Sequence, residues 1–324
     1  MKIIRNTMAV LLFAAQCTIS FTQIPAGYYG SAEGKTGEQL KAALYEIIKG
    51  HVEYPYTAST TDTWDILKSS DRDPENAENV ILIYTNRSVN GPQEYNNAQG
   101  WTREHVWAKS RGDFGTSTGT GTDLHNLKPC DVSMNSLRSN RSFAASDNPV
   151  DDNGIFTGCY VGDGFTFEPR DAVKGDVARI IFYMATRYEG YNGEPDLELT
   201  EQVLDSGDKS PLHGVLSDLL SWNDADPVDA FEENRNNVIY SYQQNRNPFI
   251  DHPEWINAIW GTATKIQNTF TLPENNQIEV YDLSGRCVYK GERNPGFRST
   301  LIPNSIYIIK DSSGIHKIII QNNR

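Results

Sequence analysis

The chain has 324 residues, of which 38% are hydrophobic and 22% are charged, and it carries a formal net charge of −13. This length and composition suit one large folded domain followed by a small one, and they exclude wholesale disorder. The negative charge argues against a protein that coats nucleic acid by neutralising its phosphates, but it allows an enzyme that binds a few phosphates in one pocket. Residues 101–145 carry six cationic and four acidic side chains, so this stretch is locally positive.

The first residues have the pattern of a secretion signal. Lys2 and Arg5 supply its positive start, the run MAVLLFAA supplies its apolar stretch, and polar residues follow near residues 21–23. We therefore predict a signal peptide over residues 1–22. The apolar run is too short to span a bilayer and no later run approaches that length, so we expect no transmembrane segment in the mature chain.

Residues 23–262 predict a mostly helical body, which places the chain in the α+β class. The first helix begins after Thr36, which forms a possible capping box with Gln39. Apolar residues at helical spacing predict the later helices. In chain order, the helical segments are residues 36–51, a core helix over residues 173–188, and two pieces within residues 233–260 that Pro248 and Pro253 separate.

Between the first helix and the core helix, the pattern predicts strands. Residues 79–85 form a short apolar run with turn-forming residues on both sides, which predicts a buried strand. The pattern of residues 101–107 predicts a second strand. Residues 108–121 are rich in Gly, Ser and Thr and predict a loop. A short strand ending at Pro129 follows, and Asp131 is placed to cap a helix after it. This strand–loop–strand–helix unit is thus embedded in the helical body.

The sequence changes character near Gly261. From residue 269 onward the chain predicts short strands of alternating polarity, with a hairpin around Ser284 and Gly285. We therefore place a domain boundary here and predict that residues 263–324 form a small C-terminal β-sandwich.

Glu104 and His105 are an adjacent pair that is only a weak sign of a site, because neighbouring side chains on a strand point to opposite faces. The segments that follow, DLHNLKP and NSLRSN, strengthen the interpretation. Asn135 and Arg138 are three residues apart and share one helix face. If the helix packs on a hairpin of the two strands, His105 faces Asn135 across a small cleft. Glu104 joins them only if its strand ends or bulges there.

The segments WTREHVWAKS and GTDLHNLKPCDVSMNSLRSNRSF closely resemble the secreted bacterial endonuclease I family, of the ββα-metal or His-Me finger class of nucleases. Two later segments, FEPRDAVKGDVARIIFYMATRY and NRNPFIDHPEW, are also similar to that family. The resemblance covers roughly residues 30–260. Several separate motifs in the expected order make it specific, and it implies a ββα-metal finger within the helical body.

The resemblance also implies a role for each matching residue. His105 matches the general base that activates water, and Glu104 and Asn135 match the metal ligands. Arg111 lies between the two strands, where the family places an arginine that holds the scissile phosphate, and Arg138 matches a second phosphate arginine on the helix. His125 and Asn126 in DLHNL are expected to brace the finger.

The chemistry of these side chains suits the roles of His105 as general base and of Glu104 and Asn135 as metal ligands. A histidine with an ordinary pKa of about 6.5 is largely neutral near pH 7 and can accept a proton from water. A carboxylate and an amide oxygen suit a hard cation, so we predict Mg²⁺, with Mn²⁺ or Ca²⁺ open at the same site. Zinc would need several Cys or His ligands, and the spacing of Cys130, Cys159, His105 and His125 matches no common zinc pattern. A disulfide between Cys130 and Cys159 stays open.

The C-terminal segments IEVYDLSGRCVYKG and SIYIIKDSSGIHKIIIQ resemble the type A sorting domain of the type IX secretion system. This resemblance implies export by the type IX machinery, so that residues 263–324 would be a sorting domain. The alternative is a small accessory β-sandwich that binds substrate or carbohydrate, but the few aromatic residues of this part form no evident platform.

Taken together, the sequence predicts a secreted, metal-dependent and largely sequence-nonspecific endonuclease that cleaves DNA, with RNA left open, to 5′-phosphate products. No helix-turn-helix, zinc finger or recognition helix indicates base readout. Two alternatives stay open, namely a metal-dependent phosphodiesterase for a non-nucleic substrate and a non-catalytic surface-binding protein. The two export features predict a place outside, or on the surface of, a Gram-negative bacterium.

Overall fold

The computed structural model describes residues 24–261 and, nearer the C-terminus, residues 277–282, 285–292, 301, 305–311 and 314–320. The chain divides into two compact units, Met1–Thr264 and Lys265–Arg324. The predicted signal peptide lies outside the described residues. Within the part that is described, no helix is both long enough and apolar enough to cross a membrane.

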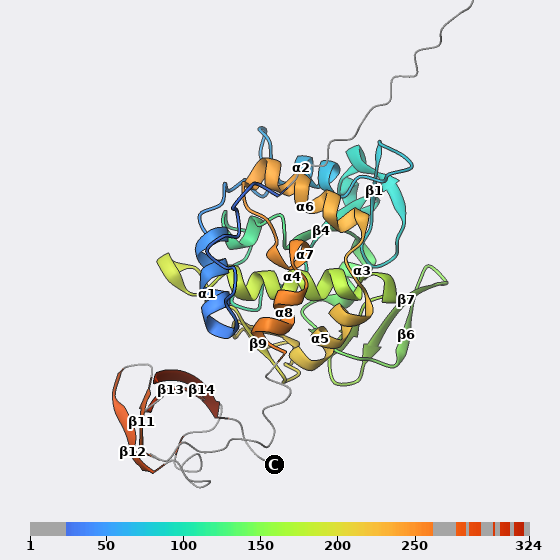
Figure 1. The fold of residues 1–324 in the computed structure, drawn as a ribbon. Coiled ribbons are helices and arrows are strands. Elements are labelled where there is room, and N and C mark those ends of the chain that lie inside the picture. Colours follow the sequence, from blue (N-terminus) through green and yellow to red (C-terminus); the bar gives the residue numbers. More distant parts are fainter. Residues whose placement is uncertain are drawn as a thin grey trace, which may run out of the picture. The chain divides into compact units, whose positions relative to one another are not determined.

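The described part of the first unit is a mixed α+β fold, as the sequence predicted (Figure 1). Its helices are α1 Gly37–Ile48, α2 Thr63–Ser70, α3 Val132–Arg138, α4 Lys174–Arg187, α5 Leu216–Ala225, α6 Ala230–Gln243, α7 Pro248–Asp251 and α8 Glu254–Ile259. Its strands are β1 Asn79–Ile81, β2 Ser88–Asn90, β3 Trp101–His105, β4 Leu127–Asp131, β5 Ser142–Phe143, β6 Asn148–Asp152, β7 Ile155–Gly162, β8 Thr166–Glu168, β9 Glu198–Thr200 and β10 Leu212–Val215.

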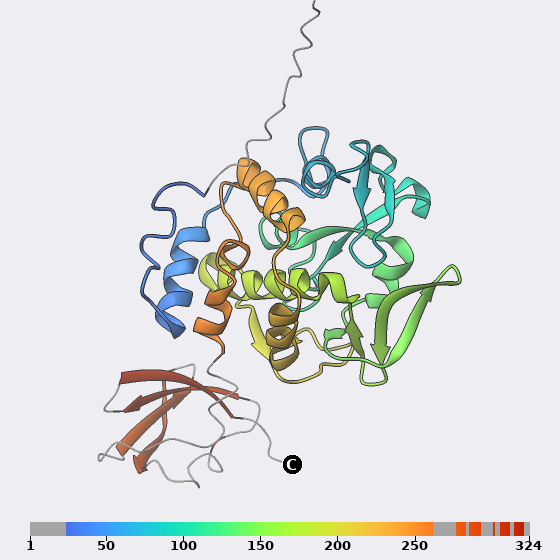
Figure 2. The same cartoon turned by 45° about the vertical axis from the view of Figure 1, so that its right-hand side comes forward.

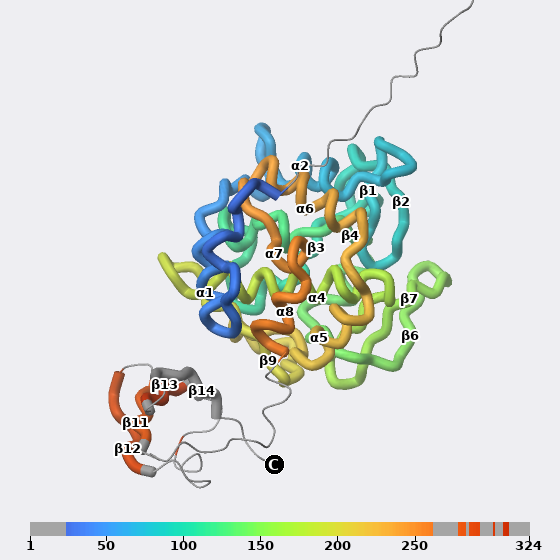
Figure 3. The backbone as a smooth tube through the Cα atoms, viewed as in Figure 1, coloured from blue at the N-terminus to red at the C-terminus, as the bar shows by residue number. Residues whose placement is uncertain are grey.

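The core of this unit is built around α4, which crosses the middle of the fold in Figures 1 and 2. Helices α1, α5 and α7 contact it, so all but the first of its side chains are buried. The predicted core positions Val177, Ile180, Ile181, Met184 and Tyr188 are all buried. Helices α1 and α8, which come from opposite ends of the unit's sequence, lie side by side (Figure 3). The strands form small separate sheets, paired β1-β2, β3-β4, β10-β9 and β5-β8-β7-β6.

Three local predictions were wrong in detail. Thr36 and Asp131 occupy the positions before α1 and α3, but neither side chain makes a capping hydrogen bond, so the capping box of Thr36 does not form. The apolar run 79–85 is a strand only as far as Ile81. The chain then turns, with the Leu82 amide bonded to the Arg87 carbonyl, which lets β1 pair with β2 in antiparallel fashion.

A buried carboxylate, that of Asp123, ties several elements of the core together. Tyr183 and Tyr188 donate their hydroxyls to its Oδ2 at 2.8 and 2.9 Å. Gln243 donates to its Oδ1 at 3.1 Å. Burial by itself would raise the pKa of Asp123, but the nearby His51 and His125 and these hydrogen bonds outweigh it and hold the pKa at about 2.

Acid is expected to destabilise the folded protein in two steps. Burial lowers the pKa of His125 from 6.5 to about 4. As the pH falls below 6.5, His125 therefore becomes protonated in the unfolded chain before it does in the folded one. The folded state loses stability over this range, until the pH reaches about 4. This loss is on the order of 3 kcal/mol. The ionised Asp123 stabilises above pH 3.8, and that effect is lost as the pH falls to about 2. Thermal unfolding between pH 7 and 4 measures the first step, and a constant Tm over that range would contradict it.

The second unit contains β11 Gln277–Asp282, β12 Cys287–Glu292, β13 Ser305–Asp311 and β14 Gly314–Ile320. β11 and β12 pair in antiparallel fashion, as the hairpin prediction required, and the four strands form one sheet in the order β12-β11-β13-β14. Ile278, Val280, Leu301, Tyr307 and Ile309 form its small apolar cluster. The second sheet that the predicted β-sandwich needs is not among the described residues.

Candidate active site

β3, β4 and α3 form a compact strand–strand–helix unit. The strands run antiparallel, with Trp101 opposite Asp131 and His105 opposite Leu127, and α3 contacts both of them. β3 ends at His105. Because the strand ends here, Glu104 can face the same cleft as His105.

Glu104, His105 and Asn135 line one cavity of about 540 Å³. The structure therefore brings together the proposed base and both proposed metal ligands, although Asn135 lies 30 residues beyond His105. Much of the remaining lining is polar and consists of Lys109, Ser110, Ser136, Ser139, Asn140 and Ser206, together with other residues of β3 and Tyr56. A polar cavity of this kind suits a charged, hydrophilic ligand better than an apolar one.

The carboxylate of Glu104 is buried and held at one of its two oxygens. Tyr84 donates its hydroxyl to Oε1 at 2.8 Å, and Arg138 forms an ion pair with the same oxygen at 3.1 Å. Burial raises the pKa of Glu104, while the charge of Arg138 and the bond from Tyr84 lower it and offset part of that effect. No hydrogen bond among the described residues engages Oε2, which leaves that oxygen open to a ligand.

The imidazole of His105 is also buried and has one nitrogen fixed. Its Nε2 lies 2.9 Å from the carbonyl oxygen of Gly121. Because a carbonyl oxygen only accepts, Nε2 carries the proton and Nδ1 is the basic nitrogen. The ring stacks on Tyr56, with centroids 5.7 Å apart. Burial lowers the pKa of His105 to about 3, so the ring is neutral near pH 7.

Asn135 projects from α3 toward β3. Its amide nitrogen donates to the carbonyl oxygen of Arg103 at 3.2 Å. This bond orients the amide, and Oδ1 makes no hydrogen bond within the described part of the chain. The side chain thus offers an oxygen, the type of atom that a hard cation prefers.

The structure does not bring Arg111 into this cavity. Its guanidinium is fully buried and donates to the carbonyl oxygens of Asp208, Asn140, Leu204 and Asp205 at 2.7 to 3.1 Å. Arg111 is not among the residues that line the cavity. Three of these bonds anchor the loop after β3 to residues 204–208, nearly a hundred residues away, and the fourth ties it to Asn140 just beyond α3. This is a structural task rather than contact with a substrate.

Arg138 lies behind the cavity. It is fully buried, and besides its ion pair with Glu104 it donates to the carbonyl oxygens of His105, at 2.9 Å, and Val106. It also donates to Nε2 of His213 at 2.7 Å. Arg138 therefore holds the end of β3 and the carboxylate of Glu104, and its donors face protein groups instead of the cavity.

Sequence reasoning missed several residues that shape the site. Tyr84 and His213 lie far from the motif in sequence and carry no local signal of their contacts with Glu104 and Arg138. Arg103 and Tyr56 line the cavity together, with the guanidinium 3.4 Å from the centre of the ring. Lys109 also lines it, and its position four residues after His105 was a signal that could have been used.

The DLHNL segment braces the unit from within. Asn126 accepts a hydrogen bond from the Trp107 amide at 2.6 Å and donates to the Trp107 carbonyl at 3.2 Å. His125 is fully buried, and its Nε2 lies 3.3 Å from the carbonyl oxygen of Asn245. Both side chains therefore contact backbone groups of neighbouring segments.

Zinc ligation by Cys130, Cys159, His105 and His125 finds no support. Among the described residues, Glu189, Asp196 and Glu198 are the only three His, Cys, Asp or Glu side chains close enough together to share an ion, and Lys41 already pairs with Glu189 and Glu198 at 2.6 and 3.6 Å. Both Cys130 and Cys159 are free and buried, so the disulfide that the sequence left open is absent.

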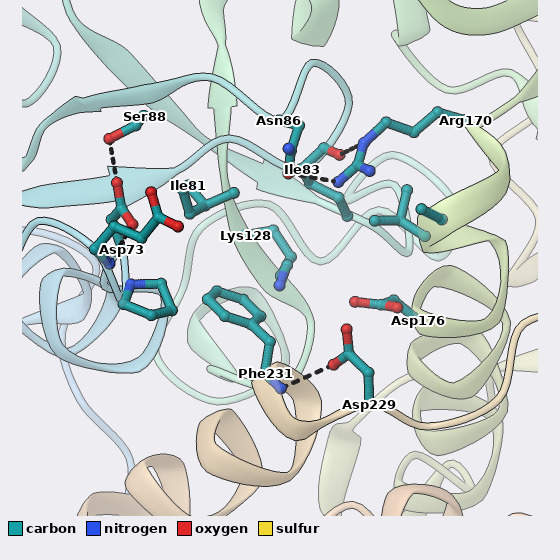
Figure 4. A pocket seen from close by; sticks show the side chains of 14 residues that line it. Asp73, Ile81, Ile83, Asn86, Ser88, Lys128, Arg170, Asp176, Asp229 and Phe231 are labelled. Atoms are coloured by element: carbon teal, nitrogen blue, oxygen red, sulfur yellow. Dashed lines mark hydrogen bonds between the residues drawn. The ribbon is translucent and has the colours of Figure 1, made fainter.

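A second cavity, of about 570 Å³, lies beside β4 (Figure 4). Several of its charged groups are engaged with the protein. Lys128 pairs with Asp71 at 2.7 Å, Arg170 donates to Asn86 at 3.3 Å, and Asp229 caps α6. No histidine is among its lining residues as described, so we place the candidate active site in the cavity of Glu104 and His105.

Comparisons with known proteins show that this chain is similar to known nucleases. The sequence pattern of the Endonuclease I family matches residues 36–254. An extracellular ribonuclease of Bacillus subtilis (strain 168) is 53% identical over 234 residues, which are 72% of this chain and 78% of that protein. An extracellular ribonuclease of Bacillus amyloliquefaciens is 51% identical with the same coverage. Endonuclease-1 of Buchnera aphidicola subsp. Baizongia pistaciae (strain Bp) is 31% identical over 133 residues, which are 40% of this chain and 46% of that protein.

Proposed function

This chain belongs to the endonuclease I family, and from that membership we propose that it is a secreted, Mg²⁺-dependent endonuclease that hydrolyses phosphodiester bonds of DNA and RNA with little sequence preference. The names of the two Bacillus relatives, both extracellular ribonucleases, support secretion and an RNA substrate. On this proposal the strand–strand–helix unit is a ββα-metal finger.

One observation carries the proposal. Glu104 Oε2, Asn135 Oδ1 and His105 Nδ1 belong to three residues that line the same cavity, and in each residue the other polar atom is held by a protein neighbour. The neighbours thus leave two oxygens and one basic nitrogen available. Two oxygens for a cation and a nitrogen for a proton are the groups that phosphodiester hydrolysis requires.

A divalent cation fits the two oxygens, because one carboxylate and one amide leave room for water and phosphate as further ligands. When bound, Mg²⁺ would neutralise charge on the reacting phosphate and stabilise the leaving 3′ oxygen. Mn²⁺ and Ca²⁺ suit the same donors. Glu104 and Asn135 would be its protein ligands.

The protein groups around His105 prepare it as the general base. The Gly121 carbonyl keeps the proton on Nε2, so Nδ1 takes the proton of the attacking water. The stack on Tyr56 fixes the plane of the ring. Attack by this water opposite the 3′ oxygen leaves a 5′-phosphate and a 3′-hydroxyl.

Removing divalent cations is expected to abolish cleavage. Purified protein in Mg²⁺ should nick supercoiled plasmid and degrade a structured RNA, and excess chelator should stop both reactions. Gel analysis of the two substrates measures this, with Mg²⁺ restored after chelation as the control for intact protein. Plasmid and RNA that both stay intact in Mg²⁺, Mn²⁺ and Ca²⁺ would refute the nuclease assignment and favour one of the two alternatives.

We further propose that the N-terminal signal segment and residues 263–324 direct the protein out of the cell through the type IX secretion system. The support for the C-terminal part is the motif IEVYDLSGRCVYKG, whose two ends form the paired strands β11 and β12. The final location would be the medium or the surface of a Gram-negative bacterium.

A further inference from the structure

We propose that Lys109 binds a phosphate of the nucleic acid substrate in the cavity of Glu104 and His105, in place of the two arginines that the sequence indicated. This inference rests on the proposed nuclease function and identifies the side chain that binds the negatively charged backbone of the substrate. The cations near the cavity differ in the protein partners that each of them already has.

Three of the four cations at or behind the cavity are engaged with the protein. Arg111 donates to four carbonyl oxygens, and Arg138 is shared between Glu104, three carbonyl oxygens and His213. The guanidinium of Arg103 lies between the rings of Tyr56 and Trp64, at 3.4 and 4.0 Å. It also donates to Thr63 at 2.8 Å and to Thr57 at 3.1 Å.

Lys109 differs from these arginines in both exposure and contacts. Its side chain is exposed and lines the cavity. Within the described residues its ammonium has neither a hydrogen bond nor an ion pair. Its backbone is nevertheless fixed, because its carbonyl oxygen accepts hydrogen bonds from the amides of Phe114 and Gly115 at 3.1 and 3.4 Å.

The proposed base lies close by as well, because His105 lines the same cavity and precedes Lys109 by four residues. A flexible, hydrated cation held at a cavity beside the reacting groups is suited to the non-bridging oxygens of a phosphodiester. The hydroxyls of Ser110 and Ser206 line the same cavity and are uncharged hydrogen-bond donors that suit a phosphate oxygen.

Oligonucleotide binding without cleavage tests the proposal. The full chain carrying His105→Ala, in chelator, is titrated with a single-stranded RNA and with a short DNA duplex over a range of salt concentrations. Adding Lys109→Ala should weaken binding of both probes by about tenfold at ~0.1 M salt and reduce the salt slope by about one. Lys109→Arg should retain most of the affinity. In the otherwise wild-type enzyme, Lys109→Ala should raise KM more than it lowers kcat, with unchanged Tm.

Lys209→Ala is the matched control, since Lys209 is exposed, pairs with Asp113 at 3.1 Å and does not line the cavity. It should leave affinity and salt slope unchanged. Equal affinity and slope with and without Lys109→Ala would overturn the assignment of Lys109 but leave the nuclease function standing. If the His105→Ala protein binds neither probe and the wild type cleaves neither, both proposals fall.

Discussion

Replacing His105 with alanine is expected to lower kcat by about 10²- to 10⁴-fold, the range over which a positioned general base contributes. The ring nitrogen Nδ1 is the basic atom in the cavity that Glu104 and Asn135 also line, and no other histidine lines the described cavity. The protein should stay folded, because the ring faces a cavity and its one hydrogen bond, to Gly121, is worth only about 1 kcal/mol. Plasmid nicking under saturating Mg²⁺, with circular dichroism of the same samples, measures both effects.

Added imidazole separates a lost base from a distorted site. The alanine variant has a ring-sized space beside Tyr56, so free imidazole should restore part of the rate in proportion to its concentration. His252→Ala is the control, since His252 is a partly exposed histidine that stacks on Trp255, and its kcat should match that of the wild type. A His105→Ala protein that retains the wild-type kcat would remove His105 as the base.

The elements whose formation depends on local pattern could be predicted from the sequence. The apolar spacing around Val177 and Ile181 predicted α4, and residues 101–143 predicted the two strands and the short helix. Details that depend on contacts with distant residues could not. Thr36 has the residue type for a cap but makes no capping bond. The prolines at 248 and 253 do more than separate helices, because they stand at the start of α7 and just before α8.

The same distinction explains the candidate site. Glu104, His105 and Asn135 lie in motifs whose order is readable, so their meeting in one cavity could be predicted. Whether an arginine is buried or faces the cavity could not be predicted, because residues remote in sequence decide it. The guanidinium of Arg111 is bonded to carbonyl oxygens of residues 204–208. Arg138 shares a helix face with Asn135, but β10 supplies His213 as its partner, and nothing in the motif indicates that contact.

Replacing Arg138 with methionine is expected to destabilise the protein by about 3–5 kcal/mol, because it leaves the buried carboxylate of Glu104 without its compensating charge. The pKa of Glu104, already raised by burial, should rise further and weaken metal binding. The variant also removes the hydrogen bonds from Arg138 to the carbonyl oxygens of His105 and Val106. Denaturant unfolding measures the loss in free energy, and the Mg²⁺ concentration for half-maximal nicking measures the second effect.

Combining Arg138→Met with Glu104→Gln decides between a positioning role and a phosphate-binding role. If Arg138 serves mainly to balance Glu104, neutralising that carboxylate should recover part of the lost stability, since Tyr84 can still donate to the amide oxygen. The coupling free energy of the two changes should then exceed about 1 kcal/mol, as for residues in one network. A phosphate ligand would behave in the opposite way. Arg138→Met would raise KM with little change in Tm, and Glu104→Gln would not rescue it, because the substrate would be the only partner lost.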